Sequence, residues 1–255
     1  MRIIGRGFIA RHLTSIEDRH PDVAVLAAGV SSIGGGYEEQ FARERELVRT
    51  TLEECKADGR RMVLFSTASH AMYGNTVNPA REVDVATGDS PYGIHKLGLE
   101  SMVVESSVPH VVLRLSHVMG SGQRRHQLLP ALIEQFDAGI VRVFAGAHRD
   151  IIDVFDVVEA LDAILASNVN NVVVNVATGR PIAITAVIDA LAARLGPAVF
   201  ELVDAAPALT TVSVERMRQL APGLPDLTGP RYLERLLDRH VPSYQRAAST
   251  NSEAV

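Results

Sequence analysis

Short apolar runs alternate along this chain with longer segments of helical periodicity. We expect strands at 2–4, 23–28, 61–66, 110–115 and 172–176. We expect helices at 8–20, 38–57, 91–106, 127–138, 156–166, 183–195, 213–220 and 229–238, with Ser213 as the cap of the seventh. This alternation is typical of α/β proteins in which helices cover both faces of a parallel sheet.

Two segments break the regular pattern. The stretch 117–150 mixes Gly, His and Arg around a single helix, and 197–240 carries most of the remaining prolines. We therefore assign a sheet core to 1–116 and 151–180 and a smaller substrate-binding lobe to 117–150 and 181–242. The polar tail at 243–255 is predicted to be disordered.

Composition narrows the class of protein. The chain has 255 residues, 47% of them hydrophobic, and a net charge of −5 without a basic run, so it is globular and nucleic acid is an unlikely partner. It carries neither a membrane span nor a secretory signal, which predicts a cytoplasmic protein. Cys55 lies on an amphipathic helix and is expected to be buried. The histidines are scattered, so no metal site is predicted.

The segment "DSPYGIHKLGLE" carries candidate chemistry. Asp89 or Ser90 is expected to cap a helix that begins at Pro91, which places Tyr92 and Lys96 four residues apart on one face. A neighbouring cation favours the phenolate, so Lys96 is expected to lower the pKa of Tyr92 toward neutrality. Tyr92 would then exchange a proton with a hydroxyl or carbonyl group. Alone, the pair is also compatible with an ordinary helix surface.

A second segment, "VLFSTASHAMYG", supports this interpretation. It is a buried strand followed by a loop rich in hydroxyl groups, with Ser66, Thr67 and Ser69 at the carboxyl end, where open α/β sheets bind their ligands. Together with Tyr92 and Lys96, a serine here completes a three-part site for proton transfer.

Several segments, in order along the chain, resemble the extended short-chain dehydrogenase/reductases that act on nucleotide sugars. They are "PDVAVLAAG", "FSTASHAMYG", "SPYGIHKLGLE", "LRLSHVMGSGQ", "HRDIIDVFDVVEA" and "VVNVATGRPIAI". The resemblance implies a Rossmann-like doubly wound parallel sheet with a small C-terminal substrate lobe. Members of the family often pair through their helices, so a homodimer formed by the last helices, around 229–238, and the helix at 38–57 is a further alternative, in which a partner or second subunit completes the cofactor pocket.

The resemblance assigns roles to the candidate residues. It makes Tyr92 the general acid/base and Lys96 the group that lowers the pKa of Tyr92 and holds the nicotinamide ribose. Ser69, four residues before Tyr73, becomes the catalytic hydroxyl, with Thr67 or Ser66 as alternatives if the loop carries an extra residue.

The same resemblance implies a site for the nucleotide sugar. Arg149 matches an arginine that holds its phosphates, with a surface ion pair to Asp150 or Asp153 as the alternative. His117 stands where the family usually has asparagine. The expected substrate-binding residues are Thr67, His70, His117, Arg124 and Arg149. Sugar dehydratases of the family carry an Asp-Glu pair where this chain has His70 and Ala71, so dehydration is disfavoured; His70 is left with a structural hydrogen bond or an acid/base role.

The cofactor site departs further from the family. Gly5, Gly7 and Ala10 fit G-x-G-x-x-A at the start of a helix, where a pyrophosphate is usually bound. By comparison with the family, one strand-helix-strand unit of roughly 30–40 residues is missing before the alanine-rich strand. That strand end offers no carboxylate for the adenosine ribose, and this absence, with Arg6, favours NADP over NAD. The expected cofactor-binding residues are Gly5, Arg6, Gly7, Phe8, Ile9, Ala27, Ala28, Gly29, Ser66, Tyr92 and Lys96.

These observations favour an NAD(P)-dependent oxidoreductase or epimerase of a nucleotide-linked sugar, and a keto-sugar reductase first. Reduction needs only exchangeable cofactor binding, whereas epimerisation needs a cofactor held through turnover, so the shortened adenosine side favours the reductase. The alternative is a sugar-nucleotide binding protein or non-redox isomerase without a cofactor, in which the glycines only allow tight strand-helix packing.

Overall fold

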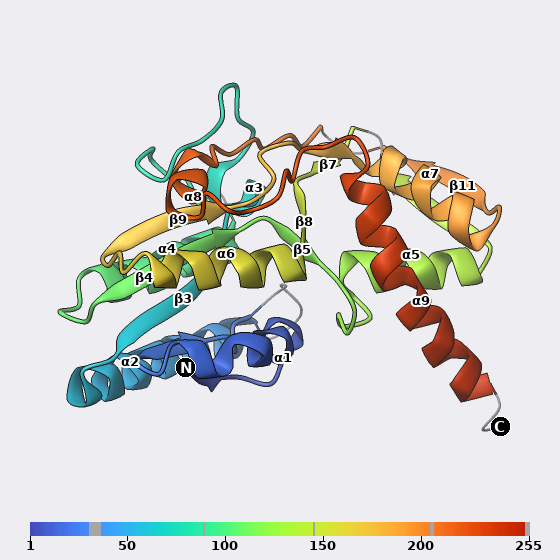
Figure 1. Ribbon diagram of the computed structural model, residues 1–255. Coiled ribbons are helices and arrows are strands. Elements are labelled where there is room, and N and C mark those ends of the chain that lie inside the picture. Colours follow the sequence, from blue (N-terminus) through green and yellow to red (C-terminus); the bar gives the residue numbers. More distant parts are fainter. Residues whose placement is uncertain (31–36, 89, 145, 205–206, 253–255) are drawn as a thin grey trace.

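The centre of the molecule is a parallel sheet of five strands. The computed structural model describes residues 1–30, 37–88, 90–144, 146–204 and 207–252, with side chains up to 246. The sheet has the order β1-β2-β3-β4-β9 (Figure 1). Its strands are β1 (Arg2–Ile4), β2 (Val23–Leu26), β3 (Arg61–Thr67), β4 (His110–Leu115) and β9 (Val172–Val176). All five lie where the apolar runs predicted strands.

Helices cover both faces of this sheet, as expected for a doubly wound fold. Along β2, Ala24 and Leu26 pack into a core cluster with residues of α2 (Tyr37–Asp58) and α4 (Pro91–Val104), which also contains Cys55. Val23 and Val25 point into the opposite cluster, formed with residues of α1 (Phe8–Leu13) and α6 (Val154–Ala166). This alternation explains why the strands are apolar throughout.

Strand β1 lies at the edge of the sheet, where its one partner among the described strands is β2, with Ile3 opposite Val25. After β2 the chain passes through α2 to β3, and the described residues form no strand beyond β1. The described residues thus form the shortened Rossmann-like sheet that the sequence predicted.

The helix predicted at 8–20 is divided into two parts. Helix α1 ends at Leu13, and a 3-10 helix follows at Thr14–Arg19. The hydroxyls of Thr14 and Ser15 donate hydrogen bonds to the carbonyl oxygens of Arg11 and His12. Such bonds from side chain to preceding turn compete with regular helical geometry, which accounts for the change.

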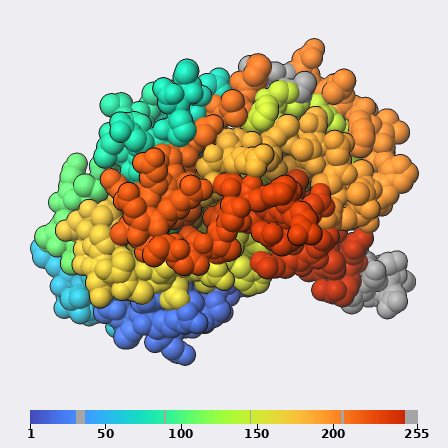
Figure 2. All heavy atoms as spheres, turned by 45° about the horizontal axis from the view of Figure 1, so that its top comes forward, coloured from blue at the N-terminus to red at the C-terminus, as the bar shows by residue number. Residues whose placement is uncertain are grey.

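A third core cluster, separate from the two on the sheet, forms the lobe on the right of Figure 1. It is built from α5 (Leu128–Asp137), α7 (Ile184–Leu195) and α9 (Tyr232–Ser252), with a two-stranded sheet of β6 (Ile140–Phe144) and β11 (Val199–Val203). In Figure 2 the orange and red C-terminal segment runs across the front of the molecule from α6 to this lobe. The sequence analysis did not predict β6 and β11.

The remaining elements are short. They are α3 (His70–Tyr73), α8 (Glu215–Leu220), β5 (His117–Met119) paired with β8 (Ile151–Asp153), and β7 (His148–Arg149) paired with β10 (Ile182–Ala183). Runs of two or three residues carry no readable periodicity, which is why these strands were missed. Helix α8 begins after Val214 rather than Ser213, whose hydroxyl accepts only a long 3.4 Å bond from the Glu215 amide.

The sequence analysis predicted a disordered tail from residue 243, whereas in the structure α9 continues to Ser252. The Ser243 hydroxyl donates to the Ser121 hydroxyl at 3.0 Å, and the Tyr244 hydroxyl donates to the Gly120 carbonyl at 2.7 Å. These bonds fix the middle of α9 against the loop after β5. Residues 253–255 of the predicted tail lie outside the described residues. No helix in the described ranges is long and apolar enough to cross a membrane.

Candidate active site

A cavity of about 760 Å³ lies at the carboxyl ends of β1, β2, β3 and β4. It brings together most of the residues that the sequence predicted for the site. The predicted residues that line it are Arg6, Gly7, Phe8, Ile9, Ala27, Ala28, Gly29, Ser66, Thr67, Ser69, Tyr92, Lys96, His117 and Arg124. Gly5, His70 and Arg149 are not among its lining residues. An open α/β sheet is expected to bind its ligand at this edge.

Helix α4 presents Tyr92 and Lys96 to the cavity. Ser90 caps the helix by accepting a 3.1 Å hydrogen bond from the Gly93 amide, with Pro91 in the first turn. The Lys96 ammonium lies 5.6 Å from the centre of the Tyr92 ring. Gly93 allows this placement, because a Cβ there would come within 1.8 Å of the Ala71 carbonyl oxygen. Asp89, the other predicted cap, lies outside the described residues.

The hydroxyl groups after β3 lie on the same cavity wall. Thr67 donates a 2.9 Å hydrogen bond to the Ser69 hydroxyl, which orients the serine at the start of α3. Ser66 is buried, lines the cavity and has no hydrogen-bond partner within the described protein. A buried hydroxyl without a partner is unfavourable, so Ser66 is suited to contact a polar group of a ligand.

Lys96 has a partner that the sequence analysis missed. Its ammonium donates a 2.6 Å hydrogen bond to the carboxylate of Glu44 on α2, and both side chains are buried. Burial, followed by the charge of Glu44, raises the pKa of Tyr92 above its ordinary value. The expectation that Lys96 lowers this pKa is therefore wrong for the structure as it stands, because burial disfavours the phenolate and Glu44 offsets the charge of Lys96.

The cavity is positively charged. Arg6, Arg11, Arg43 and Arg124 line it with Lys96, and no carboxylate occurs among the described lining residues. Such a surface favours a phosphate-bearing ligand. The sequence analysis missed Arg11 and Arg43, since neither lies in a motif.

The two glycines of the first loop have different surroundings. Gly5 has φ +133°, and a Cβ there would lie 2.4 Å from the carbonyl oxygen of Ala27, so this glycine is needed for the close approach of β1 and β2. Gly7 lines the cavity, and its Cβ would have its nearest contact at 3.9 Å. Tight packing thus explains Gly5 but not Gly7.

A narrow pocket of about 20 Å³ adjoins the cavity and contains Ser69, His70, His117, His148 and Arg149. Ser69 and His117 line both spaces. Burial and the nearby Arg149 guanidinium lower the pKa of His117 to about 4, so this imidazole is neutral at pH 7. His70 lies 3.4 Å from the Thr210 hydroxyl, in agreement with a structural hydrogen bond.

Arg149 does not form the ion pair considered as an alternative. Its guanidinium donates to the His148 carbonyl at 2.8 Å. Asp150 instead accepts hydrogen bonds from the Thr178 and Gly179 amides, and Asp153 pairs with Arg239 and His240. Among the described residues Arg149 thus has no carboxylate partner, and it lines the same narrow pocket as Ser69.

A nicotinamide dinucleotide fits part of this site. The open space at Gly7, the cationic wall and the unpartnered Ser66 suit its phosphates and its nicotinamide ribose. The end of β2 provides Ala27, Ala28 and Gly29, which cannot bind an adenosine ribose through a carboxylate. The fit is therefore good on the reacting side and poor on the adenosine side.

Comparisons with known proteins place this geometry in context. The sequence model of the NAD dependent epimerase/dehydratase family matches residues 9–177. A curated relative, dTDP-6-deoxy-L-talose 4-dehydrogenase (NAD(P)(+)) of Kitasatospora kifunensis, is 30% identical over 183 residues, which are 66% of this chain and 57% of the relative. The chain thus spans less than two thirds of that relative's length.

Solved structures share the fold. MoeE5 in complex with UDP-glucose and NAD has a TM-score of 0.81 and 22% identity, with 96% of this chain and 98% of that chain covered. RMD from Pseudomonas aeruginosa complexed with NADPH has the same TM-score and coverage at 19% identity. At these identities the likeness concerns the fold.

Proposed function

Because the chain belongs to the NAD dependent epimerase/dehydratase family, we propose that it is an NAD(P)-dependent reductase of a keto group on a nucleotide-linked sugar. The observation that carries this proposal is the presence of Ser69, Tyr92 and Lys96 on the walls of one cationic cavity at the carboxyl ends of the strands. The curated relative supports the substrate class, since its name describes a dehydrogenase of a dTDP-linked sugar.

In this proposal, the residues of the cavity have different roles in the reduction. When bound, the reduced nicotinamide supplies a hydride to the carbonyl carbon and is itself oxidised. Ser69 donates a hydrogen bond to the carbonyl oxygen, and Tyr92 transfers its proton to that oxygen as the new C–H bond forms. Tyr92 is left as a phenolate, which takes up a proton from solvent before the next cycle. Arg149 and His117 lie at the sugar end of the site, beside Ser69.

The shortened sheet supports a reductase rather than an epimerase. An epimerase must retain its dinucleotide while the keto intermediate turns over, whereas a reductase exchanges the cofactor in every cycle. Without a strand beyond β1 and without a carboxylate at the end of β2, the adenosine moiety gains few contacts from the described residues. A reductase can work with a weakly bound cofactor, because it releases the oxidised dinucleotide after every cycle.

The proposal is tested first by titration of the protein with NADPH and NADH, followed by nicotinamide fluorescence and by the heat of binding. We expect saturable binding, and oxidation of the bound NADPH when a 4-keto nucleotide sugar is added. Tyr92→Phe serves as the control, because it should bind NADPH but not oxidise it. Binding of a nucleotide sugar without binding of either dinucleotide at millimolar concentration would overturn the proposal and favour a cofactor-free binding protein or isomerase.

A further inference from the structure

Glu44 is a buried carboxylate within the apolar face of α2. The buried residues of this helix are Phe41, Glu44, Val48, Thr51 and Cys55, at the spacing of one helical stripe. Glu44 is 3% exposed, so its charge is withdrawn almost completely from water. Burial of a charged group in an apolar stripe is unfavourable unless the charge is paired. Packing of α2 alone therefore does not explain why a glutamate stands at position 44.

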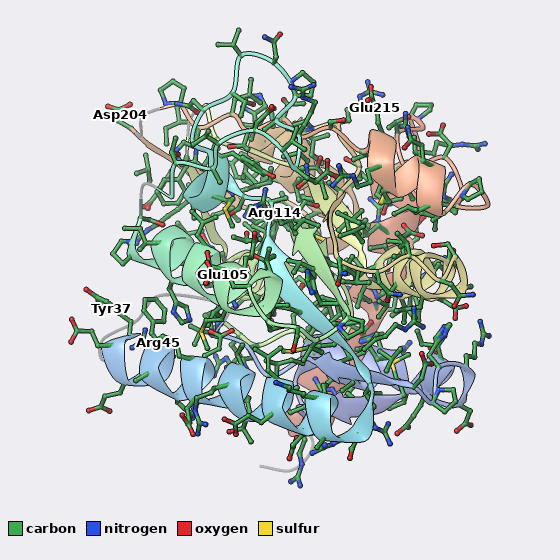
Figure 3. All side chains as sticks on the ribbon, turned by 90° about the vertical axis from the view of Figure 1, so that its left-hand side faces the viewer. Tyr37, Arg45, Glu105, Arg114, Asp204 and Glu215 are labelled. Atoms are coloured by element: carbon green, nitrogen blue, oxygen red, sulfur yellow. The ribbon has the colours of Figure 1, made fainter. Side chains whose placement is uncertain are left out.

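Three groups fix the carboxylate of Glu44. Oε1 accepts the 2.6 Å hydrogen bond from the Lys96 ammonium, and Oε2 lies 2.9 Å from Nε2 of His95 and accepts a 3.1 Å bond from the Val30 amide. The His95 ring is in turn stacked on Phe41, with 3.9 Å between ring centres. Figure 3 shows α2 and α4 side by side, which is how a residue of one helix reaches two residues of the other.

Glu44 and Lys96 occupy different positions relative to the cavity. Lys96 lines the cavity, whereas Glu44 is not among its lining residues. A Cβ on Gly29, at the end of β2, would lie 2.7 Å from Oε1 of Glu44 and 3.0 Å from the Lys96 ammonium. The absence of a side chain at Gly29 thus leaves room for the ion pair directly beside the cavity wall. An ammonium has three N–H donors, and one of them serves Glu44.

We propose that Glu44 is a positioning residue for the acid/base site: it holds the Lys96 ammonium from behind and neutralises it beside Tyr92. The catalytic role of Glu44 rests on the proposed function, whereas the ion pair between Glu44 and Lys96 is independent of it. With the charge of Lys96 cancelled, Tyr92 stays a neutral phenol and acts as a proton donor. A proton donor at the carbonyl oxygen assists reduction, whereas oxidation of the alcohol requires a phenolate as base.

The direction of the pKa values agrees with this geometry. Burial tends to raise the pKa of Glu44, but the hydrogen bond from His95 and the charge of Lys96 outweigh it, so the net shift is downward and the carboxylate is ionised. The titratable groups that face Glu44 from α4 are His95 and Lys96, and those that act on Tyr92 are Lys96 and Glu44.

The test follows the ionisation of Tyr92 in the protein without dinucleotide or sugar. Replacement of the five tyrosines by the more acidic 3-fluorotyrosine lowers the pH at which each phenol ionises. A fluorine NMR titration then reports each ring, and loss of one resonance in Tyr92→Phe assigns residue 92. We expect Glu44→Gln to move the Tyr92 transition about one pH unit or more to lower pH, because Lys96 is then uncompensated.

Three variants separate a charge effect from general loosening. Glu44→Asp keeps the carboxylate and should titrate close to the wild type. Glu100→Gln removes another buried carboxylate of the same region, paired with Arg114, and should leave the Tyr92 transition unchanged. The double variant Glu44→Gln, Lys96→Gln removes both charges and should also return the transition toward the wild-type pH.

A folded Glu44→Gln protein with the wild-type Tyr92 transition would overturn the inference. If Glu44→Gln does not fold, Lys96→Gln supplies the test, since the remaining Glu44 charge should move the transition to higher pH, and an unchanged transition would again overturn it. Because these titrations contain no dinucleotide, they stand whether or not the protein binds NADPH. Failure of the proposed function would instead appear in the NADPH titration.

Discussion

On the side of β3, β4 and α4, the cavity carries a hydroxyl, a phenol and an ammonium, each held by hydrogen bonds or packing that the structure accounts for. On the side of β1 and β2, the sheet ends at β1, and the strand end next to it offers only Ala27, Ala28 and Gly29. The groups proposed for proton transfer thus lie together on the first side, whereas the second side offers no described carboxylate to an adenosine ribose.

Under the proposed function, proton transfer and cofactor affinity therefore depend on different parts of the cavity. In the proposed function, the groups that move a proton lie on α4 and at the end of β3 with the start of α3. A sheet without the family's additional strand-helix-strand unit offers fewer contacts to the adenosine of a dinucleotide, but the residues proposed to lie near the nicotinamide are still present. Variants on the two sides should accordingly change different quantities.

The largest effect is expected on the side of β3, β4 and α4. Tyr92→Phe removes the proton donor but keeps the ring, so reduction of the keto sugar should slow by roughly 100-fold to 10,000-fold. NADPH affinity should change little, because the ring still fills its place in the wall. Stopped-flow measurement of NADPH oxidation, together with a binding titration, checks both quantities. Equal losses of rate and affinity would argue against a role confined to proton transfer.

On the side of β1 and β2, Gly5→Ala should lower stability more than any other single change in the first loop. Its Cβ would lie 2.4 Å from the Ala27 carbonyl oxygen at φ +133°, so β1 must move or detach, at a cost on the order of 3 kcal/mol. Urea unfolding followed by circular dichroism measures this loss.

Gly7→Ala is the matched control for this experiment, since its Cβ finds its nearest contact at 3.9 Å and φ is −77°. Its stability should fall by less than about 1 kcal/mol, while NADPH binding weakens about tenfold because the methyl group intrudes on the cavity. Equal stability of the two variants would mean that the β1–β2 contact does not constrain Gly5.

The sequence predicted the sheet, its helices and most of the cavity because these depend on local signals. Apolar runs marked all five strands of the sheet, and short-range spacing placed Tyr92 and Lys96 on one helix face. Which residue of another helix would meet Lys96 is a question of tertiary packing, and spacing within α4 cannot answer it. The signal available was Glu44 itself, a charge in the apolar stripe of α2.

Other features were beyond local patterns. Strands β6 and β11 pair across more than fifty residues of chain, so no turn joins them, and β11 is largely exposed, so no buried face marks it. Tyr244, within the predicted tail, is held by hydrogen bonds to Gly120 and Gln123, which are distant in sequence and therefore left no local signal. The homodimer implied by the family resemblance stays a prediction.

A smaller effect, on the pH dependence of stability, is expected from His117, which lies beside Ser69. The pKa of His117 is about 4 in the folded protein, against an ordinary value of 6.5, so the unfolded chain binds more protons between these pH values. Wild-type stability should therefore fall as the pH is lowered from 6.5 to 4, by on the order of 2 kcal/mol from this group. His117→Asn should flatten that part of the pH-stability curve in urea unfolding. A curve with the same slope in both proteins would mean that His117 is protonated as readily in the folded state as in the unfolded chain.

The smallest effect, on dinucleotide affinity, is expected at Arg6, which is exposed and lines the cavity after β1. If the missing carboxylate leaves a 2′-phosphate without repulsion and Arg6 binds it, Arg6→Ala should weaken NADPH binding by about threefold to tenfold and NADH binding less. Arg43→Ala, on the cavity wall formed by α2, is the matched control for a general loss of positive charge. An equal loss for both dinucleotides in Arg6→Ala would mean that Arg6 attracts phosphate groups without distinguishing them. The preference for NADP would then lose its support, and the side of β1 and β2 would contribute only charge to binding.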